Sequence, residues 1–155
     1  MQITLSQKER MLLEDQKSHE QICIEKYSNY ANQAQDNQLK QICKANEQAE
    51  RNHLDTINQL LSGNIPQMNQ NQNQNQNAAQ NMNTTATAVS NISDKDMCSD
   101  LLMTEKYVSG TYDTTIFEFR DTQVRDVLNH IQKEEQKHGE AIFQYMESKG
   151  MYNVQ

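Results

Sequence analysis

The chain has 155 residues and a formal net charge of −7 at pH 7. This length suffices for one compact domain with a core. The acidic balance and the lack of any Lys/Arg block argue against nucleic-acid binding, because nothing would neutralise the phosphates. No apolar run reaches the roughly 18 residues of a membrane span, and the N-terminus lacks the pattern of a signal peptide.

Residues 6–34 are expected to form a long helix. Ser6 and Glu9 have the spacing of a capping box. Behind them an otherwise apolar stripe recurs at three- and four-residue steps, which is typical of a helix with one buried face. Glu20 lies inside this stripe, between Leu13 and Cys23, so a carboxylate is expected in the core.

A second helix is predicted over 37–61, with Asp36 as its N-cap. Its stripe also contains polar residues, Glu50 and His53, which are three residues apart and therefore share one helix face. Gly63 follows the last periodic residue, as a helix C-terminus favours.

Residues 64–91 have a different composition. Of these 28 residues, 15 are Asn or Gln. Such a segment cannot supply a packed core, and we interpret it as a disordered linker. Asn/Gln-rich tracts also self-associate as β-structure, which is an alternative role for this segment.

A third helix is predicted over 94–119, capped by Ser93, with Asp96 in a position like that of a capping box. Its stripe runs from Met97 to Phe119 at helical spacing and includes Glu105. The third helix therefore resembles the first, with one acidic residue on an apolar face.

A fourth helix is predicted over 122–148, with Asp121 as its N-cap and Gly150 just after its end. Its stripe includes a second Glu-x-x-His turn, Glu135 and His138. Because no strand-like alternation occurs anywhere in the chain, the sequence predicts an all-α fold.

The two halves align without a gap when the sequence is shifted by 85 residues. The shift matches the acidic residues, the caps and the Glu-x-x-His turns, pairing Glu20 with Glu105, Tyr27 with Tyr112, Asp36 with Asp121, Glu50 with Glu135 and His53 with His138. A competing register matches Glu25-Lys26-Tyr27 with Glu105-Lys106-Tyr107 but needs a five-residue gap. We favour the ungapped register because it keeps Glu20, rather than Glu25, on the apolar face.

Each half is thus expected to be a helical hairpin, 6–61 and 93–149, that buries its stripe against the other. Together they make a single domain over 1–155, a ferritin-like four-helix bundle with one long crossover. A helix of 29 residues is about 44 Å long. The 28-residue linker, at roughly 3 Å per residue, can cross that length.

Six residues then form a candidate metal site. Two single Glu and two Glu-x-x-His turns, one from each helix in order, match the di-iron and di-manganese carboxylate bundles. Four carboxylates can neutralise and bridge two divalent ions, and two imidazoles complete the set. The alternative is a hydrogen-bonded polar core without metal. The predicted ligands of two Fe or Mn ions are Glu20, Glu50, His53, Glu105, Glu135 and His138.

Other polar residues carry weaker hypotheses. His19 and His130 have no mates in the repeat and are expected to face solvent. Tyr27 and Tyr112 are interpreted as core tyrosines with satisfied hydroxyls, with contacts to metal ligands or a radical relay as the alternative. Glu47, one turn before Glu50, is a substitute ligand.

Three cysteines, Cys23, Cys43 and Cys98, cannot all pair within one chain, and none lies in a Cys-x-x-Cys motif. We expect reduced, buried thiols. Cross-linking between chains in an assembly that later becomes oxidised is the alternative.

The second half resembles the Coat F domain of spore coat protein F-like proteins from endospore-forming bacteria. The resemblance runs from Asp100-Leu101-Leu102 through Tyr112 and His138 to the closing Lys149-Gly150-Met151-Tyr152, whose Lys-Gly-x-Tyr pattern recurs in that family. The first half, from Leu12 through His53, looks like a related N-terminal hairpin. The chain departs from the family at Met151, where tryptophan is common, and in its Asn/Gln linker.

The resemblance implies a ferritin-like bundle that is synthesised in the mother-cell cytoplasm and located in the spore coat, where other coat proteins are its partners. The family is not known for a defined catalytic activity. Our first hypothesis is therefore a non-enzymatic structural or accessory coat protein. The second is a di-metal carboxylate protein of the peroxide-detoxifying or ferroxidase-like kind. A homodimer is compatible with either.

Overall fold

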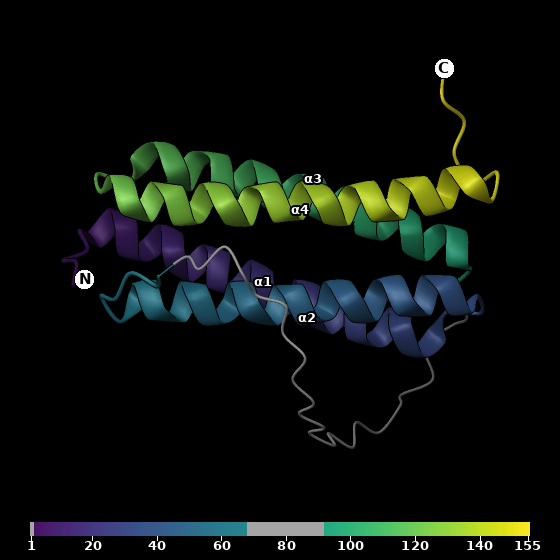
Figure 1. The fold of residues 1–155 in the computed structure, drawn as a ribbon, viewed down its shortest axis with the longest axis horizontal. Helices are drawn as coiled ribbons and strands as arrows, with labels where there is room; N and C mark the ends of the chain where they lie inside the picture. The colour runs from purple at the N-terminus through teal and green to yellow at the C-terminus, as the bar shows by residue number, and fades with distance from the viewer. Residues whose placement is uncertain (1, 68–91) are drawn as a thin grey trace.

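The computed structural model describes residues 2–67 and 92–155. Within these ranges the chain is all-α, as the sequence predicts, and the sole β-type pairing is an isolated bridge between Gln2 and Asn64. Four long helices lie roughly along one axis (Figure 1). They are α1 (Gln7–Gln33), α2 (Asn37–Leu61), α3 (Asp94–Glu118) and α4 (Thr122–Ser148).

The predicted N-caps are confirmed at all four helices. Ser6, Asp36, Ser93 and Asp121 each accept a hydrogen bond from a backbone N–H in the first turn. Such caps satisfy amide groups that have no partner inside the helix. The capping box of α1 is reciprocal, since the Ser6 amide donates to the Glu9 carboxylate at 2.7 Å. The expected ends of α1 and α3 extend one residue too far, because Ala34 and Phe119 are the C-caps.

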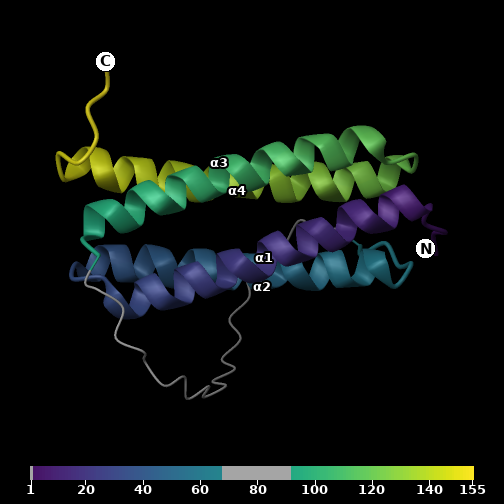
Figure 2. The ribbon, with the colours of Figure 1, turned by 180° about the vertical axis from the view of Figure 1, so that it is seen from behind.

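The helices that pack side by side run antiparallel. At one end of the bundle Arg120, after α3, binds Glu9 near the start of α1. At the other end Asp94, at the start of α3, accepts hydrogen bonds from the amides of Gln35 and Asp36 between α1 and α2. Hence α2 ends and α3 begins at opposite ends of the bundle (Figure 2).

The first residues of the predicted linker belong to the folded part. Gly63 has a φ of +83°, a left-handed conformation that glycine adopts without strain, and it ends α2. The chain then turns back, so that Asn64 pairs with Gln2 and Ile65 packs against the core. The predictions for 68–91, disorder or self-association, lie outside the described residues.

The core consists of two apolar clusters at opposite ends of the bundle. One surrounds the α3–α4 turn and the start of α1, and the other surrounds the α1–α2 turn. The first includes Leu13, Ile57, Leu60, Phe119, Val124, Leu128 and Ile131, and the second includes Ala31, Leu39, Met97, Leu101, Ile142, Tyr145 and Met146. The candidate ligands occupy the layer between the clusters, where they are shielded from water on both sides.

Candidate metal centre

Each helix contributes to one polar layer from a position near its middle. The single glutamates come from α1 and α3, and the Glu-x-x-His turns come from α2 and α4. The structure brings all six predicted residues together in two overlapping groups whose ligand atoms lie within 4.8 Å of one another. The first group is Glu20, Glu50, His53 and Glu135, and the second is Glu50, Glu105, Glu135 and His138. All six are buried.

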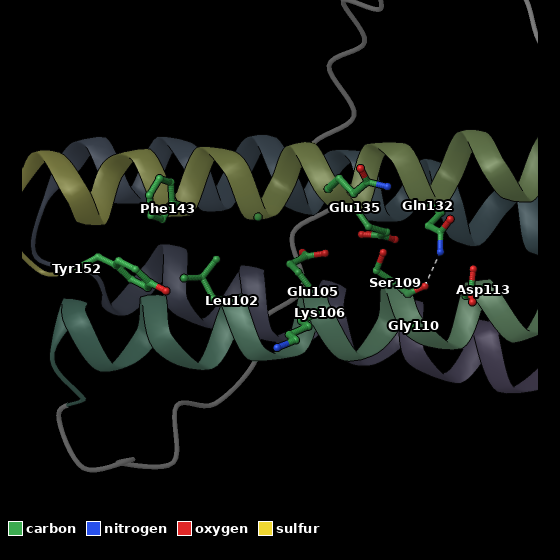
Figure 3. A pocket seen from close by; sticks show the side chains of 12 residues that line it. Leu102, Glu105, Lys106, Ser109, Gly110, Asp113, Gln132, Glu135, Phe143 and Tyr152 are labelled. Atoms are coloured by element: carbon green, nitrogen blue, oxygen red, sulfur yellow. Dashed lines mark hydrogen bonds between the residues drawn. The ribbon is translucent and has the colours of Figure 1, made fainter. Parts of the chain in front are cut away.

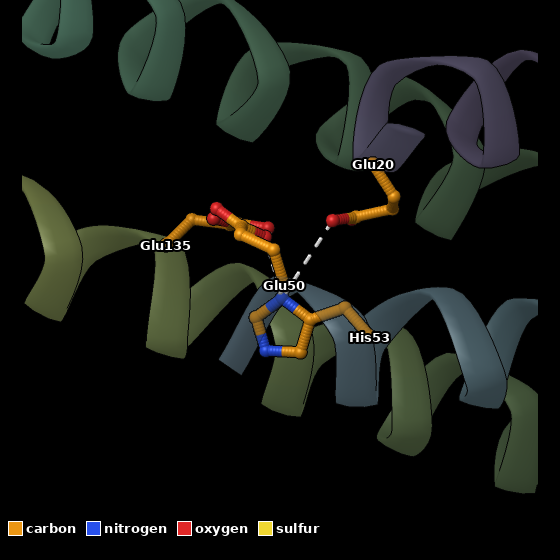
Figure 4. Close-up of side chains that lie close together, drawn as sticks. All are labelled: Glu20, Glu50, His53 and Glu135. Carbon is orange, nitrogen blue, oxygen red and sulfur yellow. Dashed lines mark hydrogen bonds and ion pairs between the residues drawn. The ribbon is translucent and has the colours of Figure 1, made fainter. Parts of the chain in front are cut away.

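Glu50 and Glu135 belong to both groups because each carboxylate reaches both imidazoles. The two oxygens of Glu50 lie 3.1 Å from His53 Nδ1 and 3.2 Å from His138 Nδ1. Those of Glu135 lie 3.2 Å from each of the same two nitrogens. The imidazole rings stack with centroids 5.6 Å apart. Figure 4 shows the first group, in which three carboxylates and one imidazole converge. This is the arrangement that bridging carboxylates and terminal histidines would have.

Glu20 and Glu105 flank the layer on either side. Glu20 Oε2 is 3.8 Å from His53 Nδ1, and Glu105 Oε1 is 3.5 Å from His138 Nδ1. Each is held by a tyrosine from the other hairpin, because Tyr112 donates to Glu20 and Tyr27 donates to Glu105. Both tyrosines are buried, so they are satisfied core residues that also contact candidate ligands.

Three carboxylate oxygens in the layer are buried without a hydrogen-bond partner among the described residues. They are Glu20 Oε2, Glu105 Oε2 and Glu135 Oε1. A buried polar atom without a hydrogen-bond partner costs about 1–3 kcal/mol. Three such atoms beside two imidazole nitrogens form an oxygen-rich donor set, which suits a hard or borderline divalent cation.

Burial and mutual repulsion divide the four carboxyls into two kinds. Burial, together with the negative charges of Glu135 and Glu50, raises the pKa of Glu20 well above its ordinary value. Burial likewise raises the pKa of Glu105 to about 9. For Glu50 and Glu135 burial acts in the same direction, but the close approach of both imidazoles outweighs it and lowers the pKa. Without metal, these pKa shifts favour the neutral form of Glu20 and Glu105 and the ionised form of Glu50 and Glu135.

The imidazoles are positively charged in the same state. Burial alone would lower the pKa of His138, but hydrogen bonds with Glu105, Glu135 and Glu50 raise it to about 11. Burial and hydrogen bonds oppose each other in the same way at His53, whose pKa is well above the ordinary value. The charged imidazoles thus face the ionised carboxylates of Glu50 and Glu135.

Glu134 is a contributor that the sequence pattern missed. Its Oε2 lies 2.8 Å from His53 Nε2, and its Oε1 lies 3.3 Å from Nε2 of the exposed His130. A carboxylate on the far nitrogen fixes the ring with Nδ1 directed at the ligand cluster, as is common for metal-binding histidines. The repeat gives no signal for it, because Ala49 precedes Glu50 where Glu134 precedes Glu135.

Three of the weaker candidates, His19, His130 and Glu47, lie outside the carboxylate–histidine layer. His130 is exposed, as predicted, but His19 is half-buried, with its Nδ1 3.4 Å from the Thr111 hydroxyl and its ring edge-on to Tyr107. The expectation of a solvent-facing His19 is thus only partly met. Glu47 is not a substitute ligand, since it pairs with Arg51 at 2.7 Å on the outside of α2.

All three cysteines are buried free thiols, as the first interpretation predicts. Burial raises the pKa of Cys43 to about 12 and that of Cys98 to about 11, and it also raises the pKa of Cys23. Thiols of this kind are unreactive near neutral pH.

A groove with a volume of about 590 Å³ lies between α3 and α4. Glu105 and Glu135 are among the residues that line it, and Ser109, Gly110 and Gly139 form part of its walls (Figure 3). At one end the Phe143 and Tyr152 rings meet edge to face with centroids 5.1 Å apart. The buried layer therefore borders a surface depression on the α3–α4 side.

Fold and site together define an all-α four-helix protein with a buried carboxylate–histidine cluster. The family model of the Coat F domain matches residues 93–155, which comprise α3, α4 and the C-terminal tail. This match supports the resemblance to the spore coat F family. No curated protein and no solved structure matches the chain. Among residues 2–67 and 92–155, no helix is long and apolar enough to cross a membrane.

Proposed function

We propose that the chain is a structural or accessory protein of the bacterial endospore coat. The observation that carries this proposal is the Coat F domain match over residues 93–155. We further propose that residues 1–155 form one ferritin-like domain made of two repeated hairpins. The reciprocal pairs Tyr27–Glu105 and Tyr112–Glu20 support it, since the 85-residue shift converts one pair into the other.

Location tests the coat proposal. An antibody against the chain should label the coat layers of mature spores, and the protein should fractionate with other coat proteins. Detection only in the soluble fraction of the mother cell would contradict it.

A second function, binding of two divalent metal ions, is favoured by the three buried carboxylate oxygens that lack hydrogen-bond partners among the described residues. One ion would use Glu20 and His53, the other Glu105 and His138, and Glu50 and Glu135 would serve both. Four carboxylates balance the charge of two divalent ions. Metal would replace the protons of the outer carboxyls and the imidazoles, because ligands bind in their deprotonated forms.

Iron or manganese would be suitable ions, because mixed carboxylate and imidazole ligands fit their preferences. Such a pair of ions, when bound, supplies redox chemistry toward oxygen species. The chain's own contribution would be to fix the ligands: Tyr112 and Tyr27 hold the outer carboxyls, Glu134 orients His53, and the two apolar clusters exclude water.

Elemental analysis tests the metal proposal. Purified protein loaded with Fe(II) or Mn(II) and freed of excess should retain about two ions per chain, as carboxylate bundles do. A Glu135→Ala variant, which lacks a shared ligand, should retain far less. Wild-type protein without metal above background would rule this function out.

A further inference from the structure

The groove between α3 and α4 reaches the candidate metal layer from the protein surface. It is bordered by Glu105 and Glu135, which are only 3% and 1% exposed. Its volume of about 590 Å³ far exceeds that of one water molecule, about 30 Å³ in the liquid. A hydrated cation fits into it.

Small residues form part of the groove walls. At Gly110 and Gly139 an added Cβ would meet no described atom within 4 Å, so the space beside both glycines is free. Ser109 adds a short side chain, and its carbonyl accepts a hydrogen bond from Gln132 at 2.8 Å that joins the two helices. Glycine inside a helix costs about 1 kcal/mol relative to alanine. No packing contact among the described residues requires a glycine at either position.

The α1–α2 side has larger residues at the matching distances from its ligands. Four residues after Glu105 and Glu135 stand Ser109 and Gly139. Four residues after Glu20 and Glu50 stand Ile24, which is buried, and Leu54, which is half-buried.

We propose that this groove is the entrance through which hydrated divalent cations reach the carboxylate–histidine layer. Ligand chemistry favours this occupant, since the carboxyl groups of Glu105, Glu135 and Asp113 line the groove and carboxyl oxygens are the ligands that hydrated divalent cations prefer. The entrance deepens the metal-binding function and rests on it. It predicts that filling the groove changes the rate of metal uptake and leaves the amount bound at equilibrium unchanged.

The test uses full-length protein with Gly139→Leu on one wall or Gly110→Leu on the other. Neither residue is a ligand, and leucine is the better helix former, so the fold is expected to persist. The control is Gln144→Leu, which adds the same side chain at an exposed position of α4 outside the groove lining. Co(II) uptake by metal-free protein is followed by stopped-flow absorbance, and bound cobalt is then measured by elemental analysis.

In the two groove variants the rate of Co(II) uptake should fall to about one tenth of the wild-type rate or lower, because a filled groove raises the barrier to passage. The control should match wild type, and the final cobalt content should be equal in all four proteins. Unchanged uptake rates in both groove variants, with wild type binding metal normally, would overturn the entrance alone. If one groove variant binds less cobalt than wild type at equilibrium, the uptake rate of the other groove variant decides whether the groove is the entrance. A wild type that binds no Co(II), Fe(II) or Mn(II) would overturn both the metal site and its entrance.

Discussion

The α1–α2 and α3–α4 hairpins contribute the same set of candidate ligands but cover them differently. Each provides one glutamate and one Glu-x-x-His turn to the central layer. Glu20 and Glu50 are 0% exposed, and Ile24 and Leu54 follow them. Glu105 and Glu135 instead border a groove whose walls include Gly110 and Gly139. The inward faces of the two hairpins are thus alike while their outward faces differ. The residues that position the candidate ligands are therefore different from the residues that control access to them.

The hairpins also differ in how their histidines are supported. His53 of α2 is bound on its far nitrogen by Glu134 of α4. The position before Glu50 that corresponds to Glu134 is occupied by alanine. The candidate group that contains His53 is therefore held by one carboxylate from outside the group, and the candidate group that contains His138 includes Glu105, which borders the groove.

Removal of a shared carboxylate should have the largest effect. Glu50→Ala takes a ligand from both groups, so bound Mn(II) should fall from about two ions per chain to nearly none. Glu20→Ala and Glu105→Ala each take a ligand from one group and should leave about one ion. Elemental analysis after loading measures all three. Equal loss in every variant would mean that the two groups do not act as separate sites.

A smaller effect is expected from the residue that distinguishes the two histidines. Glu134→Gln should lower the affinity for the ion held by His53 by about 10- to 100-fold, because hydrogen-bond partners of metal-binding histidines typically contribute that much to metal affinity. Glu140→Gln, the same change at an exposed position of α4, is the control. Isothermal titration with Mn(II) should then resolve a weakened class of site and an unchanged one. An identical weakening of both classes would contradict the assignment of Glu134 to one half.

The smallest effect concerns the contact between the hairpins at the end of the bundle. Arg120 donates to both oxygens of Glu9, at 3.0 and 2.9 Å, and the Ser6 amide donates to one of them. The Arg120 hydrogen bond is the main cause that lowers the pKa of Glu9 from 4.5 to about 2. The ionised form is thus favoured by folding, and its stabilisation is complete above pH 4.5 and lost as the pH falls toward 2.

Glu9→Gln should therefore lower the free energy of unfolding by about 1–2 kcal/mol at pH 7, since charge-assisted bonds of a partly exposed pair are of this size. The difference from wild type should narrow by pH 3. Urea unfolding at both pH values measures it, with Glu14→Gln at an exposed position of α1 as control. A cost that is the same at both pH values would show that the carboxylate charge is not what matters.

Local patterns were enough to predict the helices, their caps and the six clustered residues. The reason is that capping chemistry and the three-residue spacing of Glu50 and His53 act within one helix. Other features depend on which helix faces which. Gln16 looks like a surface residue in sequence, yet it is buried and donates to Thr115 of α3 at 3.0 Å.

Glu134 was missed for the same reason, since its partner is on α2. The groove could not be predicted without knowing which two helices form its walls, although two glycines inside predicted helices were a signal of it.

A crystal structure of Mn(II)-loaded protein, with data collected at the manganese absorption edge, would show whether the layer binds metal. Two anomalous peaks about 3.5–4 Å apart are expected, a separation typical of two-metal sites. One peak should lie beside Glu20 and His53 and the other beside Glu105 and His138, with Glu50 and Glu135 between them. A structure without manganese in this layer, in which the same six residues only hydrogen-bond to one another, would contradict it.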